Sequence, residues 1–124
     1  MVRAGGLIRA VYIRGNMPER FFEAAKAIEL PPGKMKCVEI AGRRLLLANV
    51  DGRFCATDDS CTHEDASLSA GVLKGNLVRC PLHGSRFNVC TGEALEEPAE
   101  QNLRSYPVRV EGERVLVGLG SESL

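Results

Sequence analysis

The sequence has no tryptophan, two tyrosines and only two histidines among its 124 residues. It also lacks an excess of charge of either sign, because 16 lysines and arginines balance 16 aspartates and glutamates. Proteins that bind nucleic acid through its phosphates need a basic surplus. The composition therefore argues against nucleic acid as the main partner.

Long hydrophobic runs are missing as well. No apolar stretch approaches the roughly 18 residues that a membrane-spanning helix needs. Arg9 and Arg14 interrupt the apolar residues of the N-terminal stretch, which also lacks the cleavage site of a secretory signal. We therefore expect a cytoplasmic protein without a membrane partner. At this length the chain should form one domain with a modest core.

Cysteine occurs in an odd number, five. In a cytosolic chain an odd number favours thiols or metal ligands over a framework of disulfides. Cys37, Cys55 and Cys90 lie in apolar or strand-like surroundings. We expect these three cysteines to be buried small hydrophobic residues.

Turn signals divide the chain into many short strands. Asp51-Gly52 separates two apolar runs and predicts a two-residue hairpin, because both central residues of that turn take positive φ. Similar turn signals lie at 41–42, 74–76 and 111–113. Residues 17–30 suit either a helix or an edge strand, and the turn signal at 31–33 ends the segment in both cases. The pattern predicts an all-β fold, a small antiparallel sandwich or barrel.

Both histidines follow a cysteine closely, in CTH at 61–63 and in CPLH at 80–83. Histidines satisfied by hydrogen bonds in the core would explain these pairs without a metal. A zinc site is a second possibility, although zinc sites of two cysteines and two histidines usually pair like ligands along the chain. A [2Fe–2S] cluster suits the mixture, because one iron can take two thiolates and the other two imidazoles.

The spacing of these residues resembles a family signature. C-x-H, 16 residues and then C-x-x-H is the pattern of Rieske [2Fe–2S] proteins. The flanks DDSCTHEDASLSAGVL and VRCPLHGSRFNVCTGEAL are similar to those of the soluble ferredoxins of bacterial ring-hydroxylating dioxygenases. The resemblance implies the Rieske fold for residues 21–119, with a cluster-binding insertion at about 58–98. Residues 1–20 would be an N-terminal extension and residues 120–124 a C-terminal tail.

The resemblance also implies the ligands of the cluster. Cys61 and Cys80 would bind the inner iron, and His63 and His83 would bind the outer iron near the surface. Further residues expected around the cluster are Thr62, Leu82, Gly84, Ser85, Phe87 and Pro98.

The potential of the cluster depends on donors beside it. High-potential Rieske proteins carry a serine and a tyrosine whose hydroxyls bond to the cluster or its ligands. Ser85 stands at the serine position, but Phe87 stands at the tyrosine position. One donor present and one absent place the expected potential in the lower half of the range of about −150 to +300 mV. Pro98 would stiffen a covering segment at 93–102.

Backbone groups are also expected around the cluster. N–H groups near Thr62, Leu82 and Gly84 would face the sulfides. Gly71, Gly84 and Gly92 would allow tight turns and close approaches between backbone segments.

The resemblance finally implies an electron carrier rather than an enzyme. Both histidines are used by the cluster, and the sequence has no dinucleotide-binding fingerprint. The protein would be a monomer that takes an electron from a ferredoxin reductase and passes it to a terminal oxygenase of aromatic hydrocarbon breakdown, docking transiently at the His63 and His83 tip. A small fixed subunit, like that of assimilatory nitrite reductase, is the alternative. Acidic residues near the ligands would either steer a basic partner or form a solvated surface: Glu64, Asp65, Glu96, Glu97 and Glu100.

Overall fold

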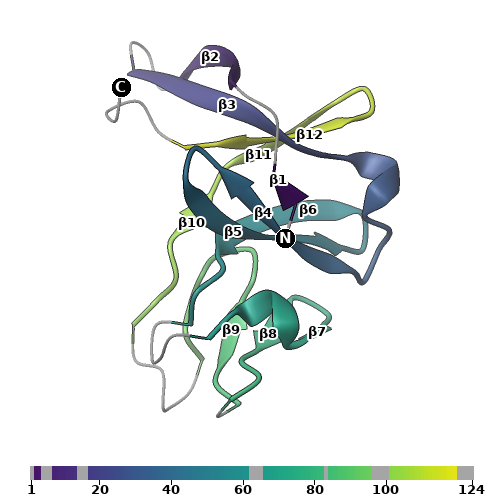
Figure 1. The fold of residues 1–124 in the computed structure, drawn as a ribbon, viewed down its shortest axis with the longest axis vertical. Coiled ribbons are helices and arrows are strands. Elements are labelled where there is room, and N and C mark those ends of the chain that lie inside the picture. The colour runs from purple at the N-terminus through teal and green to yellow at the C-terminus, as the bar shows by residue number, and fades with distance from the viewer. Residues whose placement is uncertain are drawn as a thin grey trace.

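The computed structural model describes residues 2–3, 7–13, 17–61, 66–82, 84–95 and 101–119, with the backbone alone for those before 20. The strands form three sheets stacked one above another (Figure 1). Two single 3₁₀ turns are the helical elements of the described residues: η1 (Ala27–Glu29) and η2 (Leu68–Ala70). Across these ranges no helix is long and apolar enough to cross a membrane.

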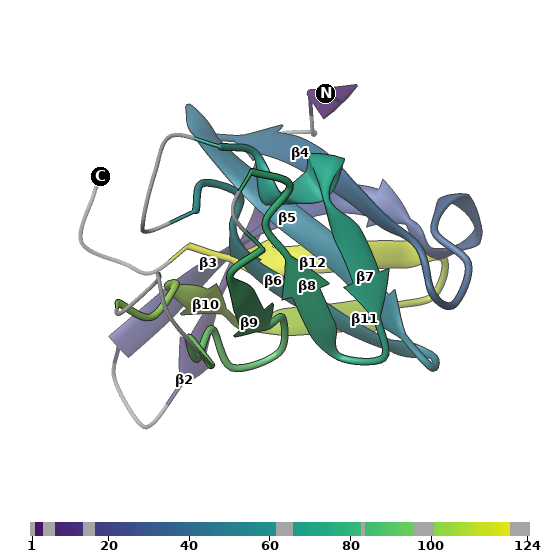
Figure 2. The ribbon, with the colours of Figure 1, turned by 90° about the horizontal axis from the view of Figure 1, so that it is seen from below.

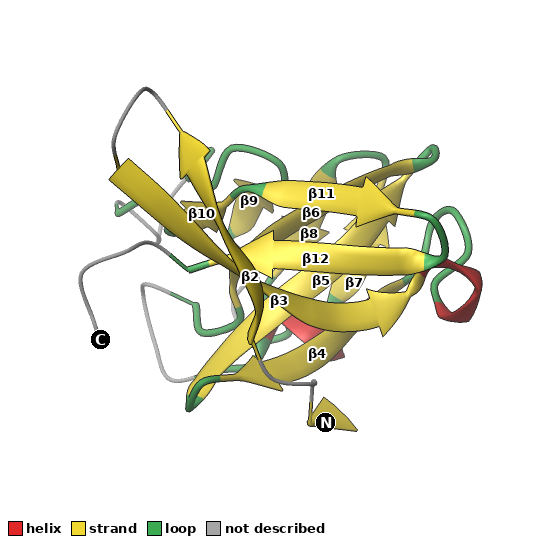
Figure 3. Cartoon of the chain, turned by 90° about the horizontal axis from the view of Figure 1, so that it is seen from above, coloured by secondary structure: helices red, strands yellow, loops and turns green. Residues whose placement is uncertain are grey.

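The first sheet, in the middle of the stack, has the strand order β1-β4-β5-β6-β10. Its strands are β1 (Val2–Arg3), β4 (Met35–Ile40), β5 (Arg43–Val50), β6 (Arg53–Asp58) and β10 (Ser105–Tyr106). The second sheet has the order β11-β12-β3-β2 and lies across the first (Figure 3). Its strands are β2 (Leu7–Ile13), β3 (Met17–Lys26), β11 (Val108–Glu111) and β12 (Arg114–Gly118).

The third sheet is the smallest and has the order β7-β8-β9. Its strands are β7 (Val72–Lys74), β8 (Leu77–Arg79) and β9 (Arg86–Asn88). Seen from below, it lies over the first sheet (Figure 2). Of the strand pairs in the described residues, β1 with β4 is parallel and the others are antiparallel. The all-β, antiparallel prediction is therefore confirmed.

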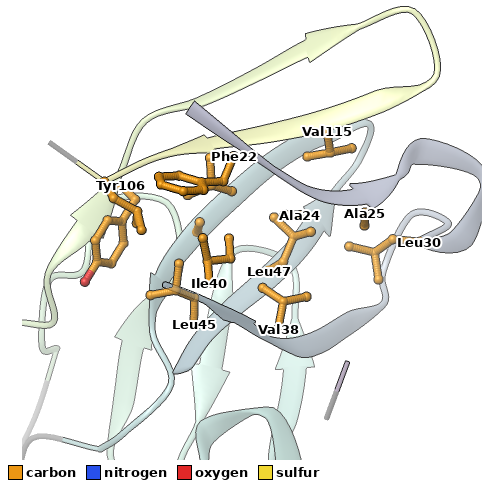
Figure 4. Packing of buried hydrophobic residues seen from close by; sticks show 13 residues of the cluster. Phe22, Ala24, Ala25, Leu30, Val38, Ile40, Leu45, Leu47, Tyr106 and Val115 are labelled. Carbon is orange, nitrogen blue, oxygen red and sulfur yellow. The ribbon is translucent and has the colours of Figure 1, made fainter. Parts of the chain in front are cut away.

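Strand β5 is buried on both faces because it lies between two apolar cores. Leu45 and Leu47 point into the core between the first and second sheets (Figure 4). Leu46 and Ala48 belong to the core between the first sheet and the third. Successive residues of a strand face opposite sides, so the unbroken apolar run LLLA serves both cores. Each fully buried leucine contributes roughly 2 kcal/mol to stability.

The hairpin between β5 and β6 forms as predicted. Asp51 and Gly52 have φ of 53° and 94°, and Val50 pairs with Arg53 on either side of them. The Gly52 N–H donates to Oδ1 of Asn49 at 2.7 Å. This side-chain bond fixes the turn and therefore the register of the two strands.

Residues 17–30 form β3 and η1, so the helical interpretation of this segment is wrong. The edge-strand interpretation also needs correction, because β3 pairs with β12 on one side and with β2 on the other. Backbone pairing with the N-terminal strand thus places β3 inside the sheet. The expected turn follows it, with Gly33 at φ 85° and a hydrogen bond from Lys34 N–H to the carbonyl oxygen of Pro31.

Cys55 and Cys90 form a disulfide, contrary to the expectation that they are buried thiols. Cys55 lies on the face of β6 that packs against the third sheet, and the turn after β9 brings Cys90 opposite to it. The two cysteines are 35 residues apart, so their pairing depends on how the sheets stack. Cys37 is a free thiol of β4, but it is half-buried rather than buried as expected.

Candidate metal centre

Cys61 and Cys80 each lie at the start of a short segment whose ends are joined by the same kind of hydrogen bond. The Cys61 N–H donates to the carbonyl oxygen of Ala66 at 2.9 Å, and the Cys80 N–H donates to that of Ser85 at 2.7 Å. In sequence these bonds enclose residues 62–65 and 81–84, named the two hairpin tips, which contain His63 and His83. Each cysteine therefore takes part, through its backbone, in the bond that closes its segment.

Burial differs between the closing ends and the tips. Cys61 is 5% exposed and Cys80 is 2% exposed, and both belong to the apolar core beneath the third sheet. Leu82, by contrast, is 60% exposed. The fold thus holds two thiols away from water and directs the second tip toward solvent.

These thiols suit a cluster that is bound on one side by buried thiolates. Neither Cys61 nor Cys80 takes part in a disulfide, and both lie among apolar side chains. His63 and His83, the expected ligands of the other side, lie outside the described residues, as does Thr62. Their assignment stays a prediction, and the described residues support the thiolate half of the ligand set.

Asp59 anchors the first ligand loop, and the sequence analysis missed this role. Its side chain, 1% exposed, accepts hydrogen bonds from the Ser67 hydroxyl and from the Ser69 N–H, the latter at 2.9 Å. It also bonds to Arg44 at 3.3 Å, and its carbonyl oxygen accepts the Leu68 N–H at 2.7 Å. A serine-rich stretch just after an aspartate was the available sequence signal.

We expect Asp59→Asn to destabilise the protein by about 2–3 kcal/mol. The amide offers one acceptor oxygen where the carboxylate offers two, and a hydrogen bond to a charged group contributes about 1.5–3 kcal/mol. Denaturant unfolding of the cluster-free protein measures the change. Ser69→Ala is the control: it keeps the backbone N–H that bonds to Asp59 and loses only the hydroxyl contact with Ser67, so a smaller loss of stability is expected. Equal stability of Asp59→Asn and the wild type would contradict the anchoring role.

The second ligand loop continues into β9, where two of the expected neighbours lie. Ser85 is 1% exposed and Phe87 is fully buried in the core that also contains Cys61 and Cys80. Gly84 has φ 79°, and its N–H donates to the carbonyl oxygen of Cys80 at 3.1 Å. The roles of Ser85, Phe87 and Gly84 toward a cluster stay predictions.

Two glycines permit close backbone contacts around these loops, as expected. A Cβ atom on Gly71 would lie 1.9 Å from the carbonyl oxygen of Arg79. A Cβ atom on Gly92, which has φ 84°, would lie 2.2 Å from that of Leu103. Any other residue would push these segments apart.

Hydrogen bonds fix the start of the expected covering segment and join the two residues that flank it. The Leu95 N–H donates to the carbonyl oxygen of Arg86 at 2.9 Å, and the Leu103 N–H donates to that of Gly92 at 2.7 Å. The middle of the segment, with Pro98, lies outside the described residues. The same is true of the acidic residues expected either to steer a basic partner or to form a solvated surface: Glu64, Asp65, Glu96, Glu97 and Glu100.

Known proteins resemble this chain over most of its length. The ferredoxin component of the naphthalene 1,2-dioxygenase system of Pseudomonas aeruginosa is 45% identical over 103 residues, which cover 83% of this chain and 99% of the relative. A chain in the complex of reduced oxygenase and oxidised ferredoxin of carbazole 1,9a-dioxygenase superposes with a TM-score of 0.76 at 37% identity, covering 84% of this chain and 96% of that one.

A second solved structure is the ferredoxin of carbazole 1,9a-dioxygenase from Nocardioides aromaticivorans IC177. It has a TM-score of 0.75 at 30% identity, with 77% of this chain and 93% of that chain covered. A putative small subunit of nitrite reductase has a TM-score of 0.67 at 24% identity, with 78% and 96% covered. At that identity the similarity shows the fold alone.

The family model of the Rieske [2Fe–2S] domain matches residues 20–107, a range that contains both hairpin tips. The matching residues thus include the two buried thiols and the two neighbouring histidines of the sequence motif. The chain belongs to the Rieske [2Fe–2S] domain family, and its cofactor is a Rieske-type [2Fe–2S] cluster.

Proposed function

We propose that this protein is a one-electron carrier that takes an electron from a ferredoxin reductase and delivers it to the terminal oxygenase of an aromatic ring-hydroxylating dioxygenase system. The supporting relatives are ferredoxin components of such systems, matched over nearly their whole length. The observation that carries the proposal is the pair of hairpin tips, each with a buried cysteine at its closing end.

The cluster, when bound, accepts and releases one electron. Cys61 and Cys80 would hold it from within an apolar core, which would exclude water from that side. The second tip would present His83 toward a partner, because the neighbouring residues Pro81 and Leu82 are exposed. His63 would lie beside it as the other imidazole ligand. We infer that docking is transient and occurs at this end of the molecule, and that the carrier works as a monomer.

The domain boundaries are part of the proposal. Residues 21–119 would form the Rieske domain, with residues 58–98 as the cluster-binding insertion. The third sheet and both hairpin tips fall within that insertion. Residues 1–20 would precede the domain, and residues 120–124 would follow it.

Electron delivery can be tested by rapid mixing. The cluster-loaded protein is reduced and mixed without oxygen with the oxidised oxygenase of a naphthalene-type system, and its visible absorbance is followed. We expect the absorbance of the oxidised cluster to return within the turnover time of the oxygenase, with one electron lost per chain. Bovine serum albumin replaces the oxygenase in the control. A reduced protein that persists equally in both mixtures would refute the carrier role.

Size-exclusion chromatography separates a free carrier from a fixed subunit. We expect a monomer that elutes apart from the oxygenase at physiological salt, because weak redox encounters bury little surface. Stable co-elution with a larger enzyme would instead support the subunit alternative.

We expect Phe87→Tyr to raise the midpoint potential of the cluster. Phe87 is fully buried beside the cysteines, and a phenolic hydroxyl that donates to sulfur favours the reduced, more negative cluster. A redox titration followed by visible absorbance measures the change. Phe54→Tyr is the control, because Phe54 packs against the other core. An unchanged potential in Phe87→Tyr would show that the ring does not reach a sulfur atom.

A further inference from the structure

The disulfide joins the first and third sheets at the base of the cluster site. Cys55 lies in β6 and is 4% exposed, and Cys90 lies in the turn that follows β9. Their Cα atoms are 4.9 Å apart, a distance that a disulfide spans without backbone movement. The bond encloses a stretch that contains Cys61, Cys80 and every strand of the third sheet. Both cluster cysteines are therefore inside one covalent loop.

Backbone contacts already join the beginning of this stretch to a segment that lies beyond its end. The Asp58 N–H donates to the carbonyl oxygen of Arg104 at 3.0 Å, and Ser105 pairs with Thr57 where β10 meets β6. The disulfide adds a covalent link at the turn after β9. Breaking it would leave the third sheet held against the first by the packing of their shared apolar core.

A groove gives access to the disulfide. Its volume is about 510 Å³, and its lining includes both cysteines together with Arg53, Tyr106 and Val110. Cys90 is half-buried and Cys55 is buried, so Cys90 is the more accessible residue of the pair. Arg53 is exposed, and its positive charge favours an incoming anion.

We propose that Cys55 and Cys90 form a thiol–disulfide exchange site for a small anionic thiol, and that the state of this bond controls how firmly the chain retains its cluster. The proposal uses the cluster of the Rieske family but does not depend on the redox partners of the proposed function.

The exchange proceeds in two balanced steps. A thiolate attacks Sγ of Cys90 and forms a mixed disulfide, the bond to Sγ of Cys55 breaks, and the electron pair leaves on that sulfur, which takes a proton from water. A second thiolate then attacks the sulfur of the bound thiol, so the two small molecules leave as a disulfide and the Cys90 thiolate is protonated. The small-molecule disulfide reverses both steps and restores the bond.

The first test identifies the bond and the order of attack. The cluster-loaded protein is alkylated under native and denaturing conditions, before and after incubation with 2-mercaptoethanesulfonate, and is then analysed by peptide mass spectrometry. We expect Cys55 and Cys90 to resist alkylation before the thiol is added and to react afterwards, with the mixed disulfide trapped on Cys90. Alkylation of both cysteines before thiol treatment, or trapping on Cys55, would overturn the proposal.

The second test measures cluster retention. With the same thiol, the wild-type protein is expected to lose its visible absorbance several-fold faster than without it. The Cys55→Ala/Cys90→Ala variant controls for direct attack of the thiol on the cluster, and its rate should not change between the two conditions. If the double variant cannot be loaded, Cys90→Ser takes its place. Equal acceleration in variant and wild type would show that the disulfide does not control retention.

The third test addresses Arg53. We expect the anionic 2-mercaptoethanesulfonate to open the disulfide faster than neutral 2-mercaptoethanol does, at matched thiolate concentration, and Arg53→Gln to remove the difference. No preference for the anionic thiol in the wild type would overturn the assignment of thiol class. Electron delivery to the oxygenase is measured separately, so failure here is distinguishable from failure of the proposed function.

Discussion

Cys80→Ser is expected to abolish binding of the cluster. Cys80 is 2% exposed, and the bond from its N–H to Ser85 holds it at the end of the second tip. A serine hydroxyl at this position is a harder and much less acidic ligand than a thiol, and the surrounding core offers no water to replace the lost iron–sulfur bond. Visible absorbance, with iron and sulfide counted per chain after reconstitution, measures the loss.

Cys37→Ser is the matched control for this experiment. Cys37 is also a thiol outside the disulfide, but it lies in β4, near Arg44 and Asp59. Burial raises the pKa of the Cys37 thiol, so at neutral pH it stays protonated and is a poor metal ligand. We expect the control to bind a full cluster. A full cluster in Cys80→Ser as well would remove Cys80 from the ligand set.

Gly92→Ala is expected to destabilise the protein by about 3 kcal/mol. The added methyl group would lie 2.2 Å from the carbonyl oxygen of Leu103, and that carbonyl belongs to backbone rather than to a flexible side chain. The substitution must therefore move the turn after β9 away from the segment that leads into β10. Because Cys90 lies in the same turn, we expect the cluster to be lost more readily too.

The stability of Gly92→Ala is measured by denaturant unfolding against a control with the same backbone strain. Gly52→Ala suits this purpose, because Gly52 has φ 94° and a Cβ atom there would meet nothing within 4 Å. Gly52→Ala is expected to lower the free energy of unfolding by about 1 kcal/mol, because of the left-handed backbone conformation alone. Equal losses of stability in the two variants would show that the contact with Leu103 does not destabilise Gly92→Ala.

The features that the sequence predicted well are local ones. The hairpin at Asp51-Gly52 follows from two adjacent residues that tolerate positive φ, and the ligand motif follows from spacings of two or three residues. The strand pattern predicted the all-β fold for a similar reason, because alternation and turn signals are read over short windows.

The features that could not be predicted from the sequence depend on tertiary packing. Residues 17–30 are rich in alanine, yet pairing with two neighbouring strands overrides their helical preference. Asp59 and its serine partners become a network only when the first ligand loop folds back. The link between Cys55 and Cys90 requires the third sheet to stack on the first, and no local pattern encodes that stacking.

Because β5 is buried on both faces, the cluster site cannot be transferred to another protein without a strand that replaces β5. Leu46 and Ala48 share an apolar core with the third sheet and the two ligand cysteines, although they precede both ligand loops in the chain. A peptide restricted to the loops and their three short strands would leave its apolar underside in water. Grafting the metal-binding motif onto another protein therefore requires a host strand whose side chains match Leu46 and Ala48 in size.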